Sequence, residues 1–141
     1  MPQHVVELTL KGLNEVGRSL KGSNVLVLGL TFRGNVKEFM NSPAIEIIKE
    51  LREWGANVYA YDPLCNPEDV KRFGAIWKED FRDIDVLIIA TDHREFKDLD
   101  LDEIAGQMRN KVIVDGRNVI DLKDARKRGF VYLAVGRSFH D

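Results

Sequence analysis

The chain has 141 residues, of which 44% are hydrophobic and 31% are charged, and its formal net charge is -2. This length fits one domain with an apolar core, and the near balance of charge argues against a nucleic-acid binder that depends on bulk positive charge. The single cysteine, Cys65, excludes an intrachain disulfide framework and a cysteine-cluster metal site, so we expect a reducing, cytoplasmic location. Charged residues interrupt the N-terminal segment, and no apolar run approaches the roughly 20 residues that span a bilayer. We therefore expect neither a signal peptide nor a membrane partner.

The first expected element along the chain is an amphipathic helix over residues 3–20. Four apolar residues recur there with helical spacing, and charged residues occupy other positions of the helical wheel: Val6, Leu10, Leu13 and Leu20. Because this helix precedes the first strand, it need not belong to the layers of a sheet. It is a candidate to pack on a partner or on an upstream domain.

Strands and helices then alternate. Apolar runs predict strands at 24–30, 57–61, 75–77, 85–90, 111–114 and 130–134. Helices are predicted at 67–73, 101–109, 122–128 and 42–54, the last with Ser42 as the N-cap and Pro43 at the first helical position. This alternation predicts an α/β fold, a Rossmann-like open parallel sheet of five or six strands with helices on both faces, preceded by the amphipathic helix.

Ligands of open parallel sheets bind outside the carboxyl ends of the strands, where this sequence places two arginines. Arg33 follows the first strand and Arg117 follows the strand at 111–114. A guanidinium group is well shaped for a phosphate, and the start of the helix at Ser42 is suited to an anion. Phe32 is a candidate to stack on a base, or equally to fill the core. Each arginine alone is ordinarily a surface charge, but two of them with Phe32 on one rim favour a binding site.

No residue is assigned a catalytic role. His93 follows a strand end and is a candidate acid or base, but it is more ordinarily a loop residue, and no second histidine lies near it to suggest a metal site. Cys65 lacks an adjacent base, so we do not expect a nucleophile. The segment from Gly29 to Gly34 lacks the internal glycines of the dinucleotide fingerprint. Asp62 stands where NAD domains keep a ribose-binding acid, although Asp-Pro also forms a turn, so an NAD-binding domain is the weaker alternative.

An ordered set of short motifs carries a resemblance. The sequence reads VLVLGLTFRGN at 25–35, SPAIEII at 42–48, YDP at 61–63, ATDHREF at 90–96, VDGRN at 114–118 and GR at 136–137. In order and spacing this set resembles the C-terminal domain of the UDP-glucose/GDP-mannose dehydrogenase family, over about residues 21–137. The form of residues 33–35 is closest to the branch that oxidises UDP-N-acetylmannosamine.

The resemblance implies an enzyme that oxidises the C6 hydroxyl of a UDP-sugar to a carboxylate in two NAD-dependent steps. Upstream domains would bind NAD and carry the catalytic cysteine, and neither is recognisable here, so we expect no NAD on this chain and no activity from it alone. Residues 1–21 would be a linker helix at the end of the central region that forms a homodimer, and residues 22–141 the UDP-binding domain. Phe32 would contact the uracil, and Arg33 and Arg117 the diphosphate.

The sequence departs from this family between positions 36 and 41. Many members carry an acidic pair at 37–38, an arginine at 40 and a glutamate at 41, where this chain has Lys37, Glu38, Met40 and Asn41. We expect a looser loop or an altered contact with the catalytic domains. A non-enzymatic alternative also stands: an oligomerisation or regulatory module that binds no nucleotide and uses the helix at 3–20 as its interface.

Overall fold

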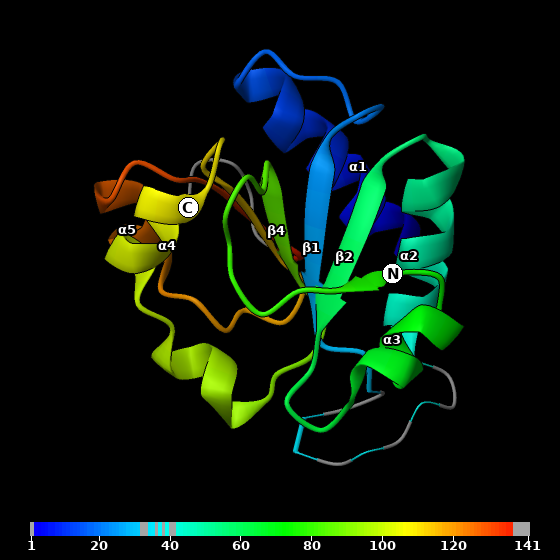
Figure 1. The fold of residues 1–141 in the computed structure, drawn as a ribbon. Helices are drawn as coiled ribbons and strands as arrows, with labels where there is room; N and C mark the ends of the chain where they lie inside the picture. Colours follow the sequence, from blue (N-terminus) through cyan, green and yellow to red (C-terminus); the bar gives the residue numbers. More distant parts are fainter. Residues whose placement is uncertain (1, 32–33, 36, 38, 40–41, 137–141) are drawn as a thin grey trace.

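The computed structural model describes residues 2–31, 34–35, 37, 39 and 42–136, and its centre is a six-stranded sheet (Figure 1). All the strand pairs are parallel, in the order β3-β2-β1-β4-β5-β6. The strands are β1 (Asn24–Leu28), β2 (Asn57–Tyr61), β3 (Ile76–Trp77), β4 (Val86–Ile89), β5 (Val112–Asp115) and β6 (Val131–Ala134). This order and direction confirm the predicted Rossmann-like sheet.

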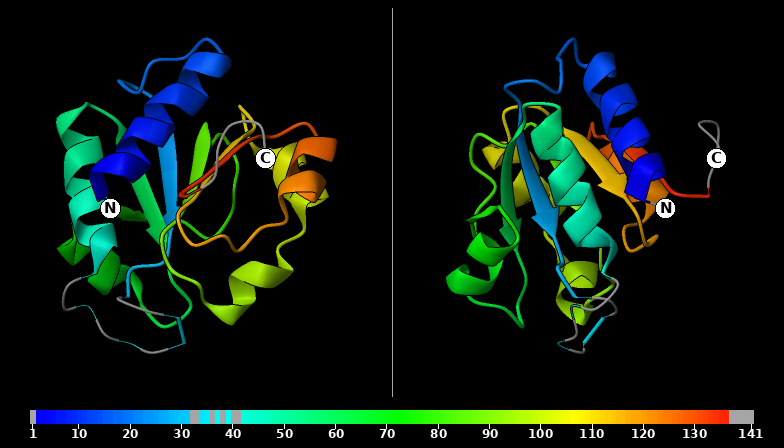
Figure 2. Two further views of the ribbon diagram at one scale, coloured as in Figure 1. Left: turned by 180° about the vertical axis from the view of Figure 1, so that it is seen from behind. Right: turned by 90° about the vertical axis from the view of Figure 1, so that its right-hand side faces the viewer.

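Helices cover both faces of the sheet (Figure 2). They are α1 (Pro2–Glu15), α2 (Pro43–Glu53), α3 (Pro67–Arg72), α4 (Leu101–Gln107), α5 (Leu122–Lys127) and a 3-10 helix, η1 (Arg94–Asp98), which the sequence did not predict. Because successive residues of a strand point to opposite faces, Val25 and Val27 join the core under α1 and α2, and Leu26 and Leu28 join the core under α4 and η1. No described helix is long and apolar enough to cross a bilayer.

The first helix joins the layers of the sheet, a packing that the sequence left open. The apolar side of α1 is buried against α2 and the strands β4, β5 and β6. The approach is so close that a Cβ added at Gly12 would lie 2.6 Å from Cγ1 of Val112. The helix also ends at Glu15, earlier than expected, because Gly17 adopts a left-handed conformation (φ 73°) and Arg18 N–H bonds back to Leu13 O at 2.9 Å.

The amino edge of the sheet is fixed by one buried carboxylate, that of Asp85. Its oxygens accept hydrogen bonds from Arg109 Nε at 2.7 Å, Asn24 N at 2.8 Å and Asn110 Nδ2 at 2.8 Å. Burial raises the pKa of Asp85, but these hydrogen bonds lower it and prevail, so the pKa stays below its ordinary value. This edge is thus closed by structural contacts, and the opposite, carboxyl edge is the one to consider for a ligand.

Candidate functional site

The carboxyl edge of the sheet brings together loops that are far apart in the sequence. β1 pairs with β2 on one side and with β4 on the other, so the strand order reverses beside β1. The described residues that follow β1, β2 and β4 lie at this edge, toward the bottom of Figure 1, and the chain leaves β5 at the same edge. This reversal is the position at which doubly wound sheets bind their ligands. Of the three predicted contacts, Arg117 is described there, whereas Phe32 and Arg33 lie outside the described residues.

The turn that leaves β1 depends on Gly29. Its φ is 103°, and an added Cβ would lie 2.4 Å from Cβ of Thr91 and 2.8 Å from the backbone nitrogen of Thr91. Only glycine adopts this conformation at so close an approach. Thr91 Oγ1 then donates to Thr31 O at 3.0 Å, so the loop after β1 crosses directly over the end of β4.

A buried cluster of Asp62, His93 and Thr31 holds this crossing in place. All three are at most 1% exposed. The carboxylate of Asp62 accepts from Leu30 N at 2.8 Å, from Leu64 N at 2.8 Å and from His93 Nε2 at 2.8 Å. His93 Nε2 also lies 3.1 Å from Thr31 Oγ1. The ends of β1, β2 and β4 are therefore joined through one carboxylate and one imidazole.

The tautomer of His93 follows from its partners. Asn35 N donates to Nδ1 at 2.8 Å, so Nδ1 carries no proton and Nε2 carries the proton that faces Asp62. The set resembles a Thr-His-Asp triad only in composition. In a triad the carboxylate and the hydroxyl lie on different ring nitrogens, whereas here both lie on Nε2 and the other nitrogen is used by the backbone. His93 is thus a structural anchor rather than an acid or base.

The described part of the loop lies on the segment that follows β4. Gly34 N donates to Asp92 Oδ1 at 2.9 Å, and Arg94 N donates to Asn35 Oδ1 at 3.1 Å. A Cβ added at Gly34 would lie 2.5 Å from Asp92 Oδ1, so the backbone approaches very closely. Asn35 has φ 63°, a conformation that asparagine tolerates. The carboxylate of Asp92 and the ring of His93 thus fix the backbone N–H groups of the successive residues Gly34 and Asn35.

Arg117 reaches the same loop from β5. Its turn is fixed by Asp115, whose carboxylate accepts from Arg117 N at 3.0 Å, Ile120 N at 2.7 Å and Tyr132 Oη at 2.8 Å. The guanidinium of Arg117 lies 3.7 Å from Asp92 Oδ2, and the side chain is 33% exposed. Arg117 therefore stands at the rim beside the residue that holds Gly34, accessible to a ligand.

Sequence reasoning missed the anchoring roles of Asp62, His93 and Asp92. Their signal was present, since Asp62 directly follows β2 and Asp92 and His93 lie shortly after β4, and both strands pair with β1. This signal could be recognised only once the strand order was known, because the strand order brings residues 31 positions or more apart into one cluster.

Cys65 is not activated. Burial first, and then the nearby carboxylates of Asp62 and Asp69, raise the pKa of its thiol to about 12. The thiol is therefore protonated at neutral pH and a poor nucleophile. Among the residues that the structure describes, no group of three or more His, Cys, Asp and Glu side chains could hold a metal ion.

The described residues do not fit a dinucleotide. A ribose-binding acid must face the ligand, but the carboxylate of Asp62 is fully buried and its oxygens accept three hydrogen bonds from within the domain. Gly29, which would belong to a pyrophosphate turn, is instead packed against Thr91. Among the described residues, Asp62 and Gly29 are therefore not placed as a dinucleotide site would require.

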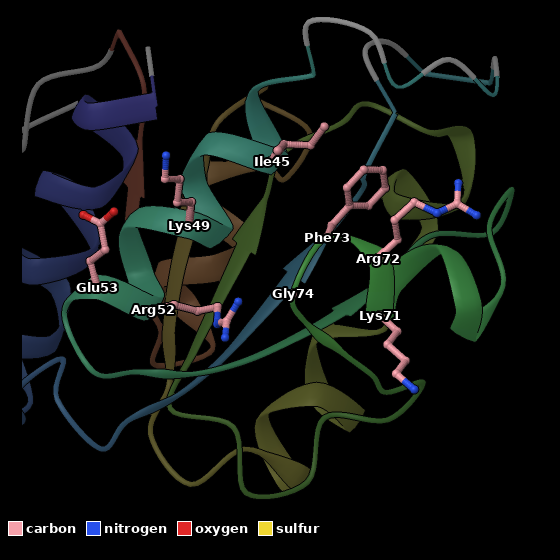
Figure 3. A pocket seen from close by; sticks show the side chains of 8 residues that line it. All are labelled: Ile45, Lys49, Arg52, Glu53, Lys71, Arg72, Phe73 and Gly74. Carbon is pink, nitrogen blue, oxygen red and sulfur yellow. The ribbon is translucent and has the colours of Figure 1, made fainter.

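A second concave region lies between α2 and the end of α3, with a volume of about 660 Å³ (Figure 3). Lys49, Arg52, Lys71 and Arg72 line it. Figure 3 shows the guanidinium of Arg52 directed toward Gly74, whereas the other three cationic groups point away from it in different directions. Because these groups do not converge, the region lacks the geometry of an anion site.

The sheet order and the anchored loop define a Rossmann-like nucleotide-binding domain, and similarity to known proteins identifies the family. The family model for the UDP-glucose/GDP-mannose dehydrogenase family, UDP binding domain, matches residues 26–122. The chain belongs to this family and corresponds to its C-terminal, UDP-binding domain.

The relatives act on more than one sugar. The UDP-glucose 6-dehydrogenase of Bacillus subtilis is 34% identical over 95% of this chain, and the UDP-N-acetyl-D-mannosamine dehydrogenase of Pyrococcus horikoshii is 31% identical over 97%. The NDP-N-acetyl-D-galactosaminuronic acid dehydrogenase of Methanosarcina mazei has a similar structure, with a TM-score of 0.84 and 28% identity over 99% of this chain. The chain spans 30%, 31% and 30% of the lengths of these three proteins.

Proposed function

We propose that this domain binds the UDP moiety of a UDP-sugar at the carboxyl edge of β1 and β4. The protein it belongs to would oxidise the C6 hydroxyl of that sugar to a carboxylate in two NAD-dependent steps. NAD and the catalytic cysteine would come from domains outside this chain, so the isolated domain would have no dehydrogenase activity. The names of the relatives support either UDP-N-acetylmannosamine or UDP-glucose as the substrate, and the Arg-Gly-Asn form of residues 33–35 favours the first.

The observation that carries the proposal is the anchored loop beside Arg117. Asp92 and His93 fix the backbone of Gly34 and Asn35, immediately after Phe32 and Arg33, and Asp92 also lies beside the Arg117 guanidinium. On this proposal Arg33 and Arg117 contact the diphosphate and Phe32 contacts the uracil. Charge-assisted hydrogen bonds from guanidinium groups suit this role.

The two alternatives have less support. An NAD-binding domain would need a ligand-facing acid after β2, and Asp62 is buried and bonded inside the domain. An oligomerisation module built on the first helix would need the apolar side of that helix as its interface, and that side is buried against the sheet. We retain a homodimer in the cytoplasm as part of the proposal, with residues 1–21 as the linker helix that leaves the dimer-forming region and residues 22–141 as the UDP-binding unit.

Titration calorimetry with UDP and with NAD tests the binding claim. We expect UDP to bind the isolated chain and NAD not to bind. Arg117→Ala and Arg33→Ala should each weaken UDP binding by about tenfold or more, the size of a lost charge-assisted hydrogen bond. Arg82→Ala is the matched control, since Arg82 is an exposed arginine at the amino edge that pairs with Asp80. An absence of heat with UDP, or unchanged binding by both rim variants, refutes the proposal.

A further inference from the structure

Described residues of the loop between β1 and α2 contact α3 in two places. Lys37 Nζ lies 3.3 Å from Asp69 Oδ2. The rings of Phe39 and Phe73 meet edge to face, with centroids 5.1 Å apart and an interplanar angle of 66°. Neither contact involves the residues of the site described above, because Asp69 and Phe73 belong to α3 and its C-cap, which follow β2.

The ion pair uses a carboxylate that is already held rigidly. Asp69 forms a capping box with Asn66: Asn66 N donates to Asp69 Oδ2 at 3.1 Å, and Asp69 N donates to Asn66 Oδ1 at 3.0 Å. Asp69 is only 7% exposed, and the hydrogen bond from Asn66, with a further contribution from Lys37, lowers its pKa. A fixed, largely buried partner makes this pair stronger than a pair between two mobile surface side chains.

The aromatic pair ties the loop to both helices. Phe39 and Phe73 pack against the core cluster that lies under α1 and α2. The carbonyl of Phe39 accepts from Ser42 N at 3.0 Å, and the hydroxyl of Ser42 in turn caps α2 by accepting from Ala44 N at 3.3 Å. Phe39 therefore links the start of α2 to the end of α3.

We propose that α3 and its C-cap position the loop between β1 and α2 for UDP binding. Lys37, Phe39, Asp69 and Phe73 would act as positioning residues that do not themselves touch UDP. This inference rests on the proposed function. Among the described residues of this loop, Gly34 and Asn35 are held by Asp92 and His93, and Lys37 and Phe39 are held by contacts with Asp69 and Phe73. A loop ordered before binding costs the ligand less, so these contacts raise affinity for UDP without a direct contact.

The contact made by Lys37 arises where this sequence departs from its relatives. At this position the sequence departs from the acidic pair of the family that it resembles, a change from which a looser loop was expected. The lysine instead reaches a carboxylate on α3, so the departure supplies a contact of its own. We therefore expect the charge at position 37, and not only its size, to matter for UDP binding.

Calorimetric titration of UDP into variants of the chain tests the inference. Phe39→Ala and Phe73→Ala should each weaken UDP binding about three- to tenfold, the range that one aromatic pair supports, and the double variant should weaken it no further than the stronger single one. Lys37→Gln, at an exposed position where misfolding is not expected, should weaken binding, and Lys37→Arg should restore it. Trp54→Ala, an exposed aromatic beyond the other end of α2, is the control and should bind like the parent.

Amide hydrogen exchange separates this inference from the proposed function. The N–H of Ser42, bonded to Phe39 O, should exchange faster in Phe73→Ala and Lys37→Gln than in the parent or in Trp54→Ala. If the parent does not bind UDP, the proposed function fails and with it the role in UDP binding, while exchange still decides whether α3 holds the loop. If UDP binds the parent and these variants equally, or if exchange at Ser42 is unchanged, the inference is overturned.

Discussion

The substitution Asp62→Asn gives the sharpest test of the buried cluster, because it changes charge and hydrogen bonding but hardly any volume. Both carboxylate oxygens of Asp62 accept N–H hydrogen bonds, Oδ1 from Leu64 and Oδ2 from Leu30 and His93. An asparagine must place its amide nitrogen at one of these two positions. In either orientation an N–H group then faces an N–H group, so at least one bond is lost and a repulsive contact replaces it.

The expected loss follows from the number of bonds involved. Hydrogen bonds to a charged group contribute about 1.5–3 kcal/mol each, and a buried donor left unpaired adds its own penalty. We therefore expect Asp62→Asn to lower the free energy of unfolding by about 3 kcal/mol, which corresponds to about 10 °C in Tm for a domain of this size. UDP affinity should fall as well, because without Asp62 to orient its ring His93 would no longer present Nδ1 as the acceptor for Asn35 N–H.

Urea and thermal denaturation measure this loss, with Asp98→Asn as the control at an exposed aspartate of η1. The control should stay within about 0.5 kcal/mol of the parent. A change below about 1 kcal/mol for Asp62→Asn would refute the reasoning. The hydrogen bonds of Asp62 would then contribute little to the stability of the domain.

Three further predictions concern other described residues. Asp85→Asn should lower the free energy of unfolding by about 2–4 kcal/mol at pH 7. Because the hydrogen bonds of Asp85, chiefly that of Arg109, outweigh burial and lower its pKa, this stability is present above about pH 4 and is lost as the pH falls through the folded pKa; urea denaturation from pH 7 to pH 3 should show the two proteins converging, and a constant gap would contradict this. Gly29→Ala should cost at least about 2 kcal/mol, measured in urea, since φ is 103° and the added Cβ meets Thr91; a neutral effect would mean that the turn differs. Cys65, with its pKa raised to about 12, should react with iodoacetamide at pH 8 far more slowly than free cysteine, and equal rates would contradict the raised pKa.

The sequence predicted most of the fold because its strands are buried on both faces. Each of the apolar runs around Val25–Val27, Val58 and Val86–Ile89 became a strand within one or two residues of the expected range. The helix α2 was equally clear, since Ser42 and Pro43 mark its start chemically. The packing of α1 was not predictable from its periodicity, which shows that one side is apolar but not which surface covers it.

The site was harder to predict for a related reason. Arg117 alone would be an ordinary surface charge, and it became a candidate only together with Arg33 and Phe32 on the same rim. Asp62 and His93 are only meaningful as a pair, and the pair exists only once β2, β1 and β4 are known to be neighbours. From local sequence Asp62 could be a turn residue and His93 a loop residue, and neither interpretation includes the hydrogen bond between them.

The polar residues of the carboxyl edge divide by burial into two groups with different expected behaviour. Asp62, His93 and Asp115 are at most 1% exposed, and none of the buried side-chain nitrogens and oxygens among the described residues lacks a hydrogen-bond partner. Their bonding capacity is used within the domain, so substitutions there should reduce stability and UDP affinity together. Among the described residues, the guanidinium of Arg117 only approaches Asp92, at 3.7 Å, so its substitution should reduce affinity and leave stability nearly unchanged. Measured on the same variants, that difference separates the groups that build the loop from the group that is proposed to meet the ligand.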